Sequence, residues 1–172
     1  MIVYFSAAAQ HPPHIPKFDF FYMHSINSSI FFTTFRSLSF LSPAQKVRLL
    51  EWKVRIDLAL YASRGSPKLL LHEVESYKAK QNSDWDAIFT RVKNYDDDDG
   101  HAAKLVRALA HGEQVSAKWE GKDGFRIKGD VWRKVGNMAI DSVEAAGPTW
   151  VRNAGFEEAW EDVPIREGEA RL

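Results

Sequence analysis

Six histidines are the side chains of this sequence best suited to chemistry, because imidazole is both the usual acid–base group and a common metal ligand. His24 lies in an apolar, phenylalanine-rich segment, where an unpaired buried polar ring would cost about 1–3 kcal/mol. Its partner is therefore either Asn27, Ser28 or a backbone carbonyl, in a structural role, or a metal ion or substrate. Of the other histidines, His11 and His14 in a proline-rich segment are expected to be solvent-exposed and inert, and His72 and His111 near helix ends to be partly exposed.

His101 and Lys104 form the second candidate site. Residues three apart on a helix project from the same face, and the alanines around this pair leave room beside it for a cofactor or a substrate. The alternative is structural: His101 caps the start of the helix, and Lys104 is exposed and pairs with Asp97 or Asp99. Spacing alone leaves both interpretations open.

Other charged groups favour structural roles. Lys53 and Asp57 are four residues apart on a predicted helix, which is typical of a solvated surface ion pair. The acidic run 96–99 lacks the spaced oxygen ligands and the glycine of a calcium loop, so we interpret it as a charged helix start. The sequence contains no dinucleotide fingerprint, P-loop, G-x-S-x-G or H-E-x-x-H motif, which disfavours a nucleotide site, a serine hydrolase and a zinc protease.

Composition excludes several further classes of function. The chain has 172 residues, enough for one domain, and its 6 Trp, 11 Phe and 5 Tyr can bury a core. Lys plus Arg equals Asp plus Glu at 23 each, so no net field recruits nucleic acid. The absence of cysteine excludes a disulfide scaffold, a thiol nucleophile, zinc fingers and iron–sulfur clusters.

A membrane span is not expected. The longest charge-free run, between Asp19 and Arg36, has about the minimum length that spans hydrocarbon, but it contains His24 and several Ser, Thr and Asn side chains. A buried helix is the better interpretation of this segment. We therefore expect no membrane partner and a cytoplasmic location.

Periodicity and punctuation predict an all-α fold, an irregular array of about six helices. Three prolines make residues 1–17 an irregular lead-in, residues 18–166 form the helical domain, and residues 167–172 are a frayed tail. A hairpin hidden in 118–128 is the alternative to an all-helical chain. The helices are expected at about 18–36, 43–65, 67–77, 84–93, 98–111 and 130–145, with Gly112 ending the fifth and one short helix in 150–160.

The helix at 43–65 has the clearest signals. Ser42 supplies an N-cap, Pro43 suits the first helical position, and Gln45 completes a capping box. The apolar residues of this helix form one stripe at 3-4-4-3 spacing, which indicates an amphipathic helix. The stripe consists of Val47, Leu50, Val54, Leu58 and Tyr61.

Five segments, taken together and in order, resemble the questin oxidase-like family. They are FFYMHSINSS at 20–29, LLEWKVRIDL at 49–58, YASRGSP at 61–67, DGHAAKLVRAL at 99–109 and WVRNAGF at 150–156. The resemblance covers about residues 18–166 and corresponds to the C-terminal half of a larger all-helical enzyme. Residues 1–17 look unrelated to the family.

The resemblance implies an oxidoreductase of fungal secondary metabolism that uses molecular oxygen to open the ring of an anthraquinone-type polyketide. Members of the family were first described as NADPH-dependent and Baeyer–Villiger-like, and at least one is understood as a non-haem iron oxygenase with a carboxylated lysine. Carried onto this sequence, His24 and His101 become Fe(II) ligands, and Lys104 becomes the lysine that takes up CO₂, with Lys53 as second choice. Carboxylation makes the lysine an anionic oxygen ligand that iron accepts.

Three functions therefore stay open. The first is an iron-dependent monooxygenase or dioxygenase that binds a flat polycyclic aromatic substrate. The second is an NADPH-dependent Baeyer–Villiger-type monooxygenase without iron, and the third is a non-catalytic helical fragment or binding module. Because family members are longer, we expect further histidine ligands from an N-terminal half, an incomplete and inactive site in this chain alone, and that half or a second copy as partner.

Overall fold

The computed structural model describes residues 1–167 and confirms the predicted all-α class. Helices joined by loops make up this part of the chain, and its β-structure is confined to two isolated bridges, His14 with Ile165 and Asp19 with Val151. In chain order, the elements are α1 (Ile2–Ala8), α2 (Phe20–Ser29), α3 (Phe31–Ser37), α4 (Pro43–Ser63), α5 (Leu71–Glu75), α6 (Trp85–Lys93), α7 (His101–Ser116), the 3₁₀ helix η1 (Ala117–Trp119), α8 (Val131–Glu144) and the 3₁₀ helix η2 (Glu157–Trp160).

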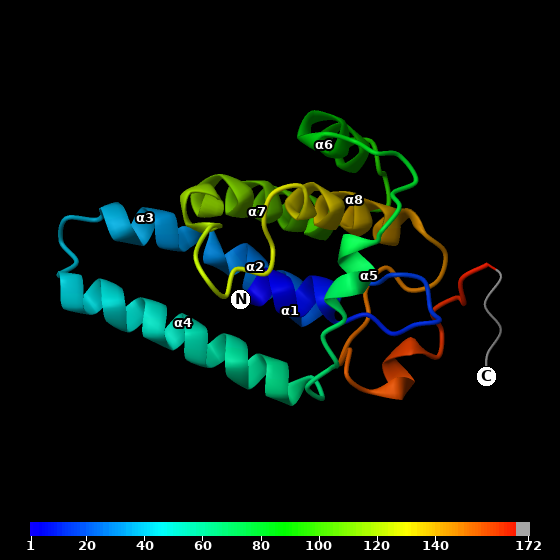
Figure 1. The fold of residues 1–172 in the computed structure, drawn as a ribbon, viewed down its shortest axis with the longest axis horizontal. Coiled ribbons are helices and arrows are strands. Elements are labelled where there is room, and N and C mark those ends of the chain that lie inside the picture. The colour runs from blue at the N-terminus through cyan, green and yellow to red at the C-terminus, as the bar shows by residue number, and fades with distance from the viewer. Residues whose placement is uncertain (168–172) are drawn as a thin grey trace.

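The helices are arranged around α2 (Figure 1). Helices α7 and α8 pack against each other, α2 packs on α7 and on α1, and α6 covers the α7–α8 pair from the other side. Helix α4 lies along α2 on the side away from α7, and α3 projects with the first half of α4 from one end of the molecule. Helix α4 is joined to the rest through α2 and, at its C-terminal end, through Tyr61, whose ring centroid lies 4.7 Å from that of Phe5 of α1.

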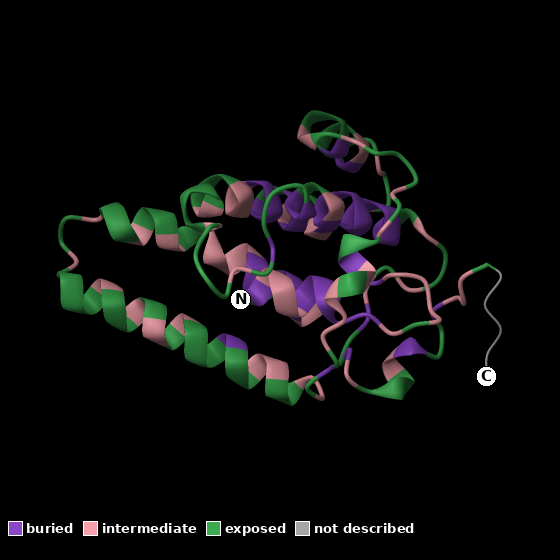
Figure 2. Cartoon of the chain, in the orientation of Figure 1, coloured by how far each residue is buried: buried purple, intermediate pink, exposed green. Residues whose placement is uncertain are grey.

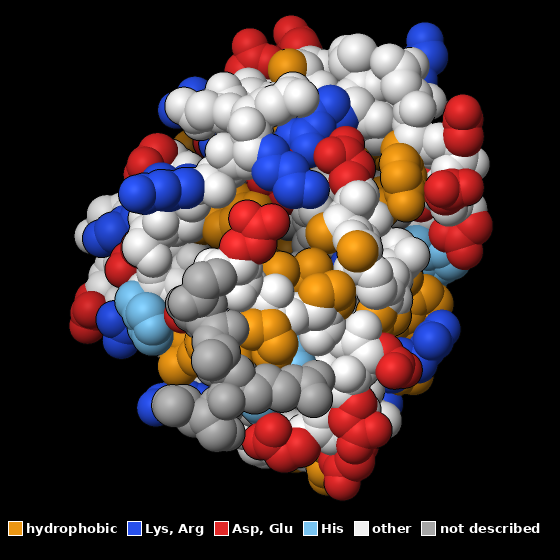
Figure 3. All heavy atoms as spheres, turned by 90° about the vertical axis from the view of Figure 1, so that its right-hand side faces the viewer, with side chains coloured by type: hydrophobic (Ala, Val, Ile, Leu, Met, Phe, Trp, Pro, Cys, Tyr) orange, Lys and Arg blue, Asp and Glu red, His pale blue; other side chains and the backbone are white. Residues whose placement is uncertain are grey.

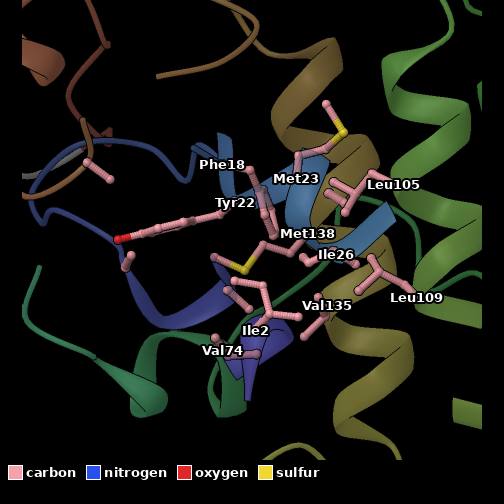
Figure 4. Close-up of a cluster of buried hydrophobic side chains, with 14 of the residues drawn as sticks. Ile2, Phe18, Tyr22, Met23, Ile26, Val74, Leu105, Leu109, Val135 and Met138 are labelled. Carbon is pink, nitrogen blue, oxygen red and sulfur yellow. The ribbon is translucent and has the colours of Figure 1, made fainter. Parts of the chain in front are cut away.

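A smaller hydrophobic cluster joins α6 to α7 and α8, and the main hydrophobic core lies between α1, α2, α5, α7 and α8 (Figure 4). Its members come from segments far apart in the sequence, so each helix is held mainly by tertiary packing rather than by its own propensity. The central buried side chains are Ile2 of α1, Phe18, Tyr22, Met23 and Ile26 in and before α2, Val74 of α5, Leu105 and Leu109 of α7, and Val135 and Met138 of α8.

Helix α1 corrects the prediction that residues 1–17 are an irregular lead-in. Residues 2–8 are helical, and Ile2, Ser6, Ala7 and Ala8 are buried. The prolines that suggested an irregular segment begin at Pro12, beyond the end of this helix, so they do not prevent it from forming. The short helix is stabilised by its contacts with α2 and α5.

The predicted helix at 18–36 is also two helices, with α2 ending at Ser29 and α3 starting at Phe31. The hydroxyls of Ser28 and Ser29 donate to the carbonyls of Ser25 and Ile26, at 2.8 and 2.6 Å. Such bonds compete with the backbone ladder and favour a helix end.

Gly112 does not end its helix as predicted, because α7 continues to Ser116. The glycine serves close packing instead: a Cβ there would lie 2.8 Å from the Trp132 ring of α8. By contrast, the predicted start of α4 is confirmed, with Ser42 and Gln45 forming the capping box before Pro43. The segment 118–128 forms no hairpin, and the short 67–77 helix is reduced to α5.

Surface features agree with the charge balance of the sequence. Figure 3 shows acidic and basic side chains interspersed over one end of the molecule. Within residues 1–167, no helix has both the length and the apolar character needed to cross a membrane. Most of the predicted tail, residues 168–172, lies outside the described part of the chain.

Lys17 ties the segment before α2 to the end of α8. Its side chain is fully buried, and its ammonium donates to the carbonyls of Ser142 and Ala145, at 2.6 and 3.2 Å. These carbonyls belong to the last turn of α8, where a cation is favoured by the helix dipole. Burial, with a smaller contribution from Lys80, lowers the pKa of Lys17 to about 8.

The pH dependence of stability tests this contact through Lys17→Met. The folded pKa is about 8 and the ordinary value is 10.5, so the unfolded chain binds more protons between these pH values. The free energy of unfolding of the wild type should therefore rise between about pH 8 and pH 10, relative to that of Lys17→Met, by up to about 1.4 kcal/mol per pH unit. Urea unfolding of both proteins measures this difference. A difference that stays flat or falls over that range contradicts the assignment.

Candidate functional site

The fold brings His24 and His101 together, although they are far apart in the sequence. His24 projects from α2 and His101 from the first turn of α7, and their ring centroids are 5.1 Å apart with the rings nearly perpendicular. The packing of α2 on α7 creates this proximity. The two imidazoles form a pair that we call the histidine pair.

Phe20 holds both rings of the histidine pair. Its ring centroid lies 4.6 Å from that of His24 and 5.0 Å from that of His101. The Arg152 guanidinium carbon lies 4.7 Å from the centroid of the same ring, and Trp150 flanks it at 6.5 Å. Because Phe20 is one turn before His24 in α2, the start of this helix determines where both histidines lie.

The tautomer of His101 is set by Asp99. The Nδ1 atom of His101 is hydrogen-bonded to the Asp99 carboxylate, which also accepts from the backbone N–H of His101 at 3.3 Å. This bond from His101 holds the pKa of Asp99 below its ordinary value. With Nδ1 donating to a carboxylate, Nε2 is the nitrogen left free to accept a proton or bind a metal ion.

The structural alternative for His101 is wrong, because Asp98 caps the helix in its place. One carboxylate oxygen of Asp98 accepts from the N–H of Ala102 at 2.9 Å, and the other accepts from that of Ala103 at 3.1 Å. The acidic run at 96–99 is therefore a helix start, as predicted, and it also orients a histidine.

Lys104 lies one turn beyond His101 and close enough for its charge to act on both His24 and Asp99. Within residues 1–167, its ammonium forms no hydrogen bond and no ion pair within 4 Å, so the predicted pairing with Asp97 or Asp99 is wrong. Lys104 is half-buried. The charge of this ammonium and that of the Asp99 carboxylate therefore act on His24 in opposite directions.

His24 differs from its predicted environment. Its side chain is exposed, and in the described part of the chain it bonds neither Asn27 nor Ser28. Asn27 accepts from Arg107 at 3.2 Å instead. The part of the ring that is buried, together with the positive charges of His101 and Lys104, lowers the pKa of His24. The negative charge of Asp99 acts in the opposite direction and raises this pKa. The ring is thereby kept neutral, the form that binds metal ions.

Lys53, the second candidate lysine, lies in a separate cluster between α4 and α2. Its ammonium donates to Oδ2 of Asp57 at 2.6 Å and to the hydroxyl of Ser25 at 3.0 Å, and Ser25 also donates to Asp57. The predicted solvated pair is wrong: the Lys53 and Asp57 side chains are 13% and 4% exposed. Ser25 follows His24 and projects about 100° away from it around the helix. The structure therefore places Lys53 away from the histidine pair.

The remaining histidines lie elsewhere. His11 and His14, predicted to be exposed and inert, are partly buried against Trp160, and His11 contacts Glu157 at 3.1 Å. His111 bonds Thr33 at 2.9 Å. Among residues 1–167, no group of three or more His, Cys, Asp or Glu side chains is placed to hold a metal ion. Within the described part of the chain, the histidine pair therefore brings together two imidazoles, with the Lys104 amine one turn away.

One largely apolar cavity lies apart from the histidine pair. It measures about 330 Å³ and lies between α1, the second half of α7 and the loop at 124–127. Its lining from α2 is Ser29, and neither histidine of the pair nor Lys104 contributes to it. This cavity is therefore not part of the candidate site, which lies where α2 meets α7 and where the His24 side chain is exposed.

Comparison with known proteins gives the class. The family model described as questin oxidase-like matches residues 1–109, and the chain belongs to this family. The matched range includes His24, His101 and Lys104, and it starts at residue 1, so it also includes the segment at 1–17 that was expected to lie outside the family.

Individual relatives are similar over almost the whole chain. The Baeyer–Villiger monooxygenase dmxR6 of Cryptosporiopsis sp. is 42% identical over 164 residues, which cover 91% of this chain and 36% of the relative. The questin oxidase of Aspergillus fumigatus is 38% identical over 167 residues, which cover 94% and 37%. The oxidoreductase AflY of Aspergillus parasiticus is 40% identical over 151 residues, which cover 87% and 30%. The chain thus spans about a third of the length of these relatives.

The role of Lys53 is tested by Lys53→Met, which leaves the buried Asp57 carboxylate without its cation. We expect this variant to lose about 3–5 kcal/mol of the free energy of unfolding. The control, Arg55→Met, removes only an exposed pair with Glu51 and should cost about 0–1 kcal/mol. Urea unfolding measures both. Equal losses for the two variants would show that Lys53 has no structural role.

The electrostatics of the histidine pair are tested by Lys104→Met. Removing this positive charge should raise the pKa of His24 toward its ordinary value of 6.5. An NMR titration measures this pKa, with His24→Gln assigning the signal and Lys118→Met as a control for a lysine outside the site. A His24 pKa that stays unchanged or falls in Lys104→Met contradicts the placement of the lysine.

Proposed function

We propose that this chain carries part of the iron centre of a fungal oxygenase that opens the ring of an anthraquinone-type substrate. The observation that carries the proposal is the histidine pair, two imidazoles 5.1 Å apart on separate helices with Lys104 one turn away. The names of the relatives, a questin oxidase and a Baeyer–Villiger monooxygenase, support an oxidoreductase.

The donor atoms suit such a centre in part. His24 is held neutral, and His101 has its Nε2 free because Asp99 occupies Nδ1, an arrangement common among metal-binding histidines. Imidazole nitrogens suit iron among other transition metals. When bound, Fe(II) supplies the activation of molecular oxygen that ring opening requires.

Lys104 is the third ligand that this chain would contribute to the iron centre. Its ammonium first loses one proton to solvent, and the neutral amine then adds to CO₂, forming an N–C bond and releasing a second proton, so the lysine changes from a cation to an anionic oxygen ligand. The absence of an ion pair for Lys104 within residues 1–167 leaves its amine free for this reaction. The change in charge also removes a positive group that lowers the pKa of His24.

The remaining residues of the site position these groups. Phe20 and Trp150 present aromatic rings beside the histidine pair, where a flat polycyclic substrate can stack. Arg152 lies against the Phe20 ring, so its charge faces the same region. Further ligands come from the part of the family polypeptide that this chain does not span.

A second candidate is an NADPH-dependent Baeyer–Villiger-type monooxygenase without iron, whose reaction type agrees with the names of the relatives. The two candidates differ in a simple test on a full-length relative. Turnover that survives metal chelation and consumes NADPH favours the second candidate, and turnover that chelation abolishes favours iron.

Metal content tests the proposed centre in this chain. We expect iron in protein loaded anaerobically with Fe(II), measured by elemental analysis, and its loss in His101→Ala and in Lys104→Ala, because each variant removes a ligand. His111→Ala, on the same helix but outside the site, is the control. Iron that binds equally to wild type and His101→Ala contradicts the assignment.

Carboxylation of Lys104 has its own readout. In ¹³C-bicarbonate, the wild type should show a carbamate signal by NMR that is absent from Lys104→Arg. A signal of equal intensity in both proteins places the carbamate on another amine.

A further inference from the structure

Helix α4 presents its apolar stripe to solvent. In Figure 2 most of this helix is exposed, and its one fully buried residue is Asp57. An amphipathic helix in a complete fold turns such a stripe toward the core. Here four members of the predicted stripe, which we call the α4 stripe, are substantially exposed: Val47 at 65%, Leu50 at 42%, Val54 at 45% and Leu58 at 49%.

The polar face of α4 occupies the inner position instead. Lys53 and Asp57 bind Ser25 of α2 through a buried ion pair, and the apolar contacts of α4 with the core come from Leu60 and Tyr61 at its C-terminal end. The α4 stripe lies beside this pair around the helix: Leu50 shares the face of Asp57, and the other three members lie about 60–100° further round. Helix α3 contacts α4, with Lys46 donating to the Arg36 carbonyl at 2.8 Å, but it leaves these four side chains exposed.

The spacing, length and charged border of the α4 stripe are those of a protein–protein interface. Its spacing of three and four residues is that of a helix seam, and from Val47 to Leu58 it runs about 16 Å, or three turns. A row of exposed ion pairs borders it, with Glu51 contacting Arg48 at 3.2 Å and Arg55 at 2.6 Å. Four exposed apolar side chains in a row form a continuous surface, unlike single apolar residues scattered over a protein. A continuous apolar surface with a polar rim marks a site of protein association.

The similarity to longer proteins indicates what covers the stripe. Over 91% of its length this chain is 42% identical to a relative of which it spans only 36%, and other relatives show similar shares. In those proteins the remaining two thirds must pack against the region that this chain represents. We propose that the α4 stripe is the docking site for an apolar helix from the part of the questin oxidase-like polypeptide that this chain does not span.

This docking is independent of the iron chemistry, because the α4 stripe and the histidine pair lie on different sides of α2. The docking also connects the docked segment to α2 through α4. The docked segment holds α4, and α4 holds α2 through Ser25, the residue next to His24. The two thirds of the polypeptide outside this chain can thus be fixed relative to the histidine pair without contacting it.

Thiol labelling tests the docking. The chain has no cysteine, so Val54→Cys introduces one reporter on the stripe, and Ala59→Cys introduces a matched one on the opposite, exposed side of α4. Both thiols should react readily with a maleimide in this chain. At the position aligned with Val54 in full-length dmxR6, we expect reaction to be slower by at least about tenfold than in this chain.

Two outcomes overturn the proposal. The first is equal reactivity of the Val54-position thiol in this chain and in full-length dmxR6, which shows that nothing covers the stripe. The second is protection of the thiol that disappears when dmxR6 is diluted until sedimentation shows a monomer. That result assigns the stripe to contacts with a second copy of the protein. Hydrogen exchange of the α4 amides in both unmodified proteins gives the same comparison without a substitution, and slower exchange in monomeric dmxR6 is the supporting result.

Discussion

The Asp19 carboxylate fixes the element on which the rest of the structure depends. One of its oxygens accepts from the N–H groups of Phe21 and Tyr22, at 2.8 and 3.2 Å, and so caps α2. The other accepts from the N–H of Ala154 at 3.0 Å, and a bridge to Val151 adds further bonds. Since Asp19 is 1% exposed, these charge-assisted bonds hold the start of α2 rigidly against the C-terminal segment.

With its start fixed by Asp19, α2 makes a different set of contacts on each of three faces. Tyr22, Met23 and Ile26 enter the hydrophobic core. Ser25 binds the buried pair on α4, and the face that starts with Phe20 presents His24 to His101. A single rotation of α2 about its axis would disturb all three at once, so the position of the histidine pair follows from the same packing that stabilises the fold. The site and the α4 stripe lie on either side of this helix.

Local signals in the sequence were sufficient for some features and not for others. The start of α4 was predicted because Ser42, Pro43 and Gln45 act through neighbouring backbone groups. The break between α2 and α3, the short α1 and the role of Gly112 were not, because each depends on serine back-bonding or on a packing partner distant in the sequence. Lys53 and Asp57 have the spacing of a surface pair, and only the approach of α2 buries them.

The family resemblance, and not the spacing of residues, was the reason for grouping His24 with His101 and Lys104 in one candidate site. No spacing rule joins His24 to His101, which lie on separate helices, whereas His101 and Lys104 share one helical turn. The role of Asp99 could have been suspected from its position two residues before His101. Phe20 and Arg152 were missed because aromatic and cation–π contacts between distant segments leave no pattern in the sequence.

The most direct test of a metal centre at the histidine pair is anomalous diffraction from crystals of this chain loaded anaerobically with Fe(II). Data recorded on both sides of the iron absorption edge locate the metal without reference to activity. The account predicts an anomalous peak within bonding reach of His24 and of Nε2 of His101. A peak at other histidines, such as His11 and His14, with none at this pair, would contradict it.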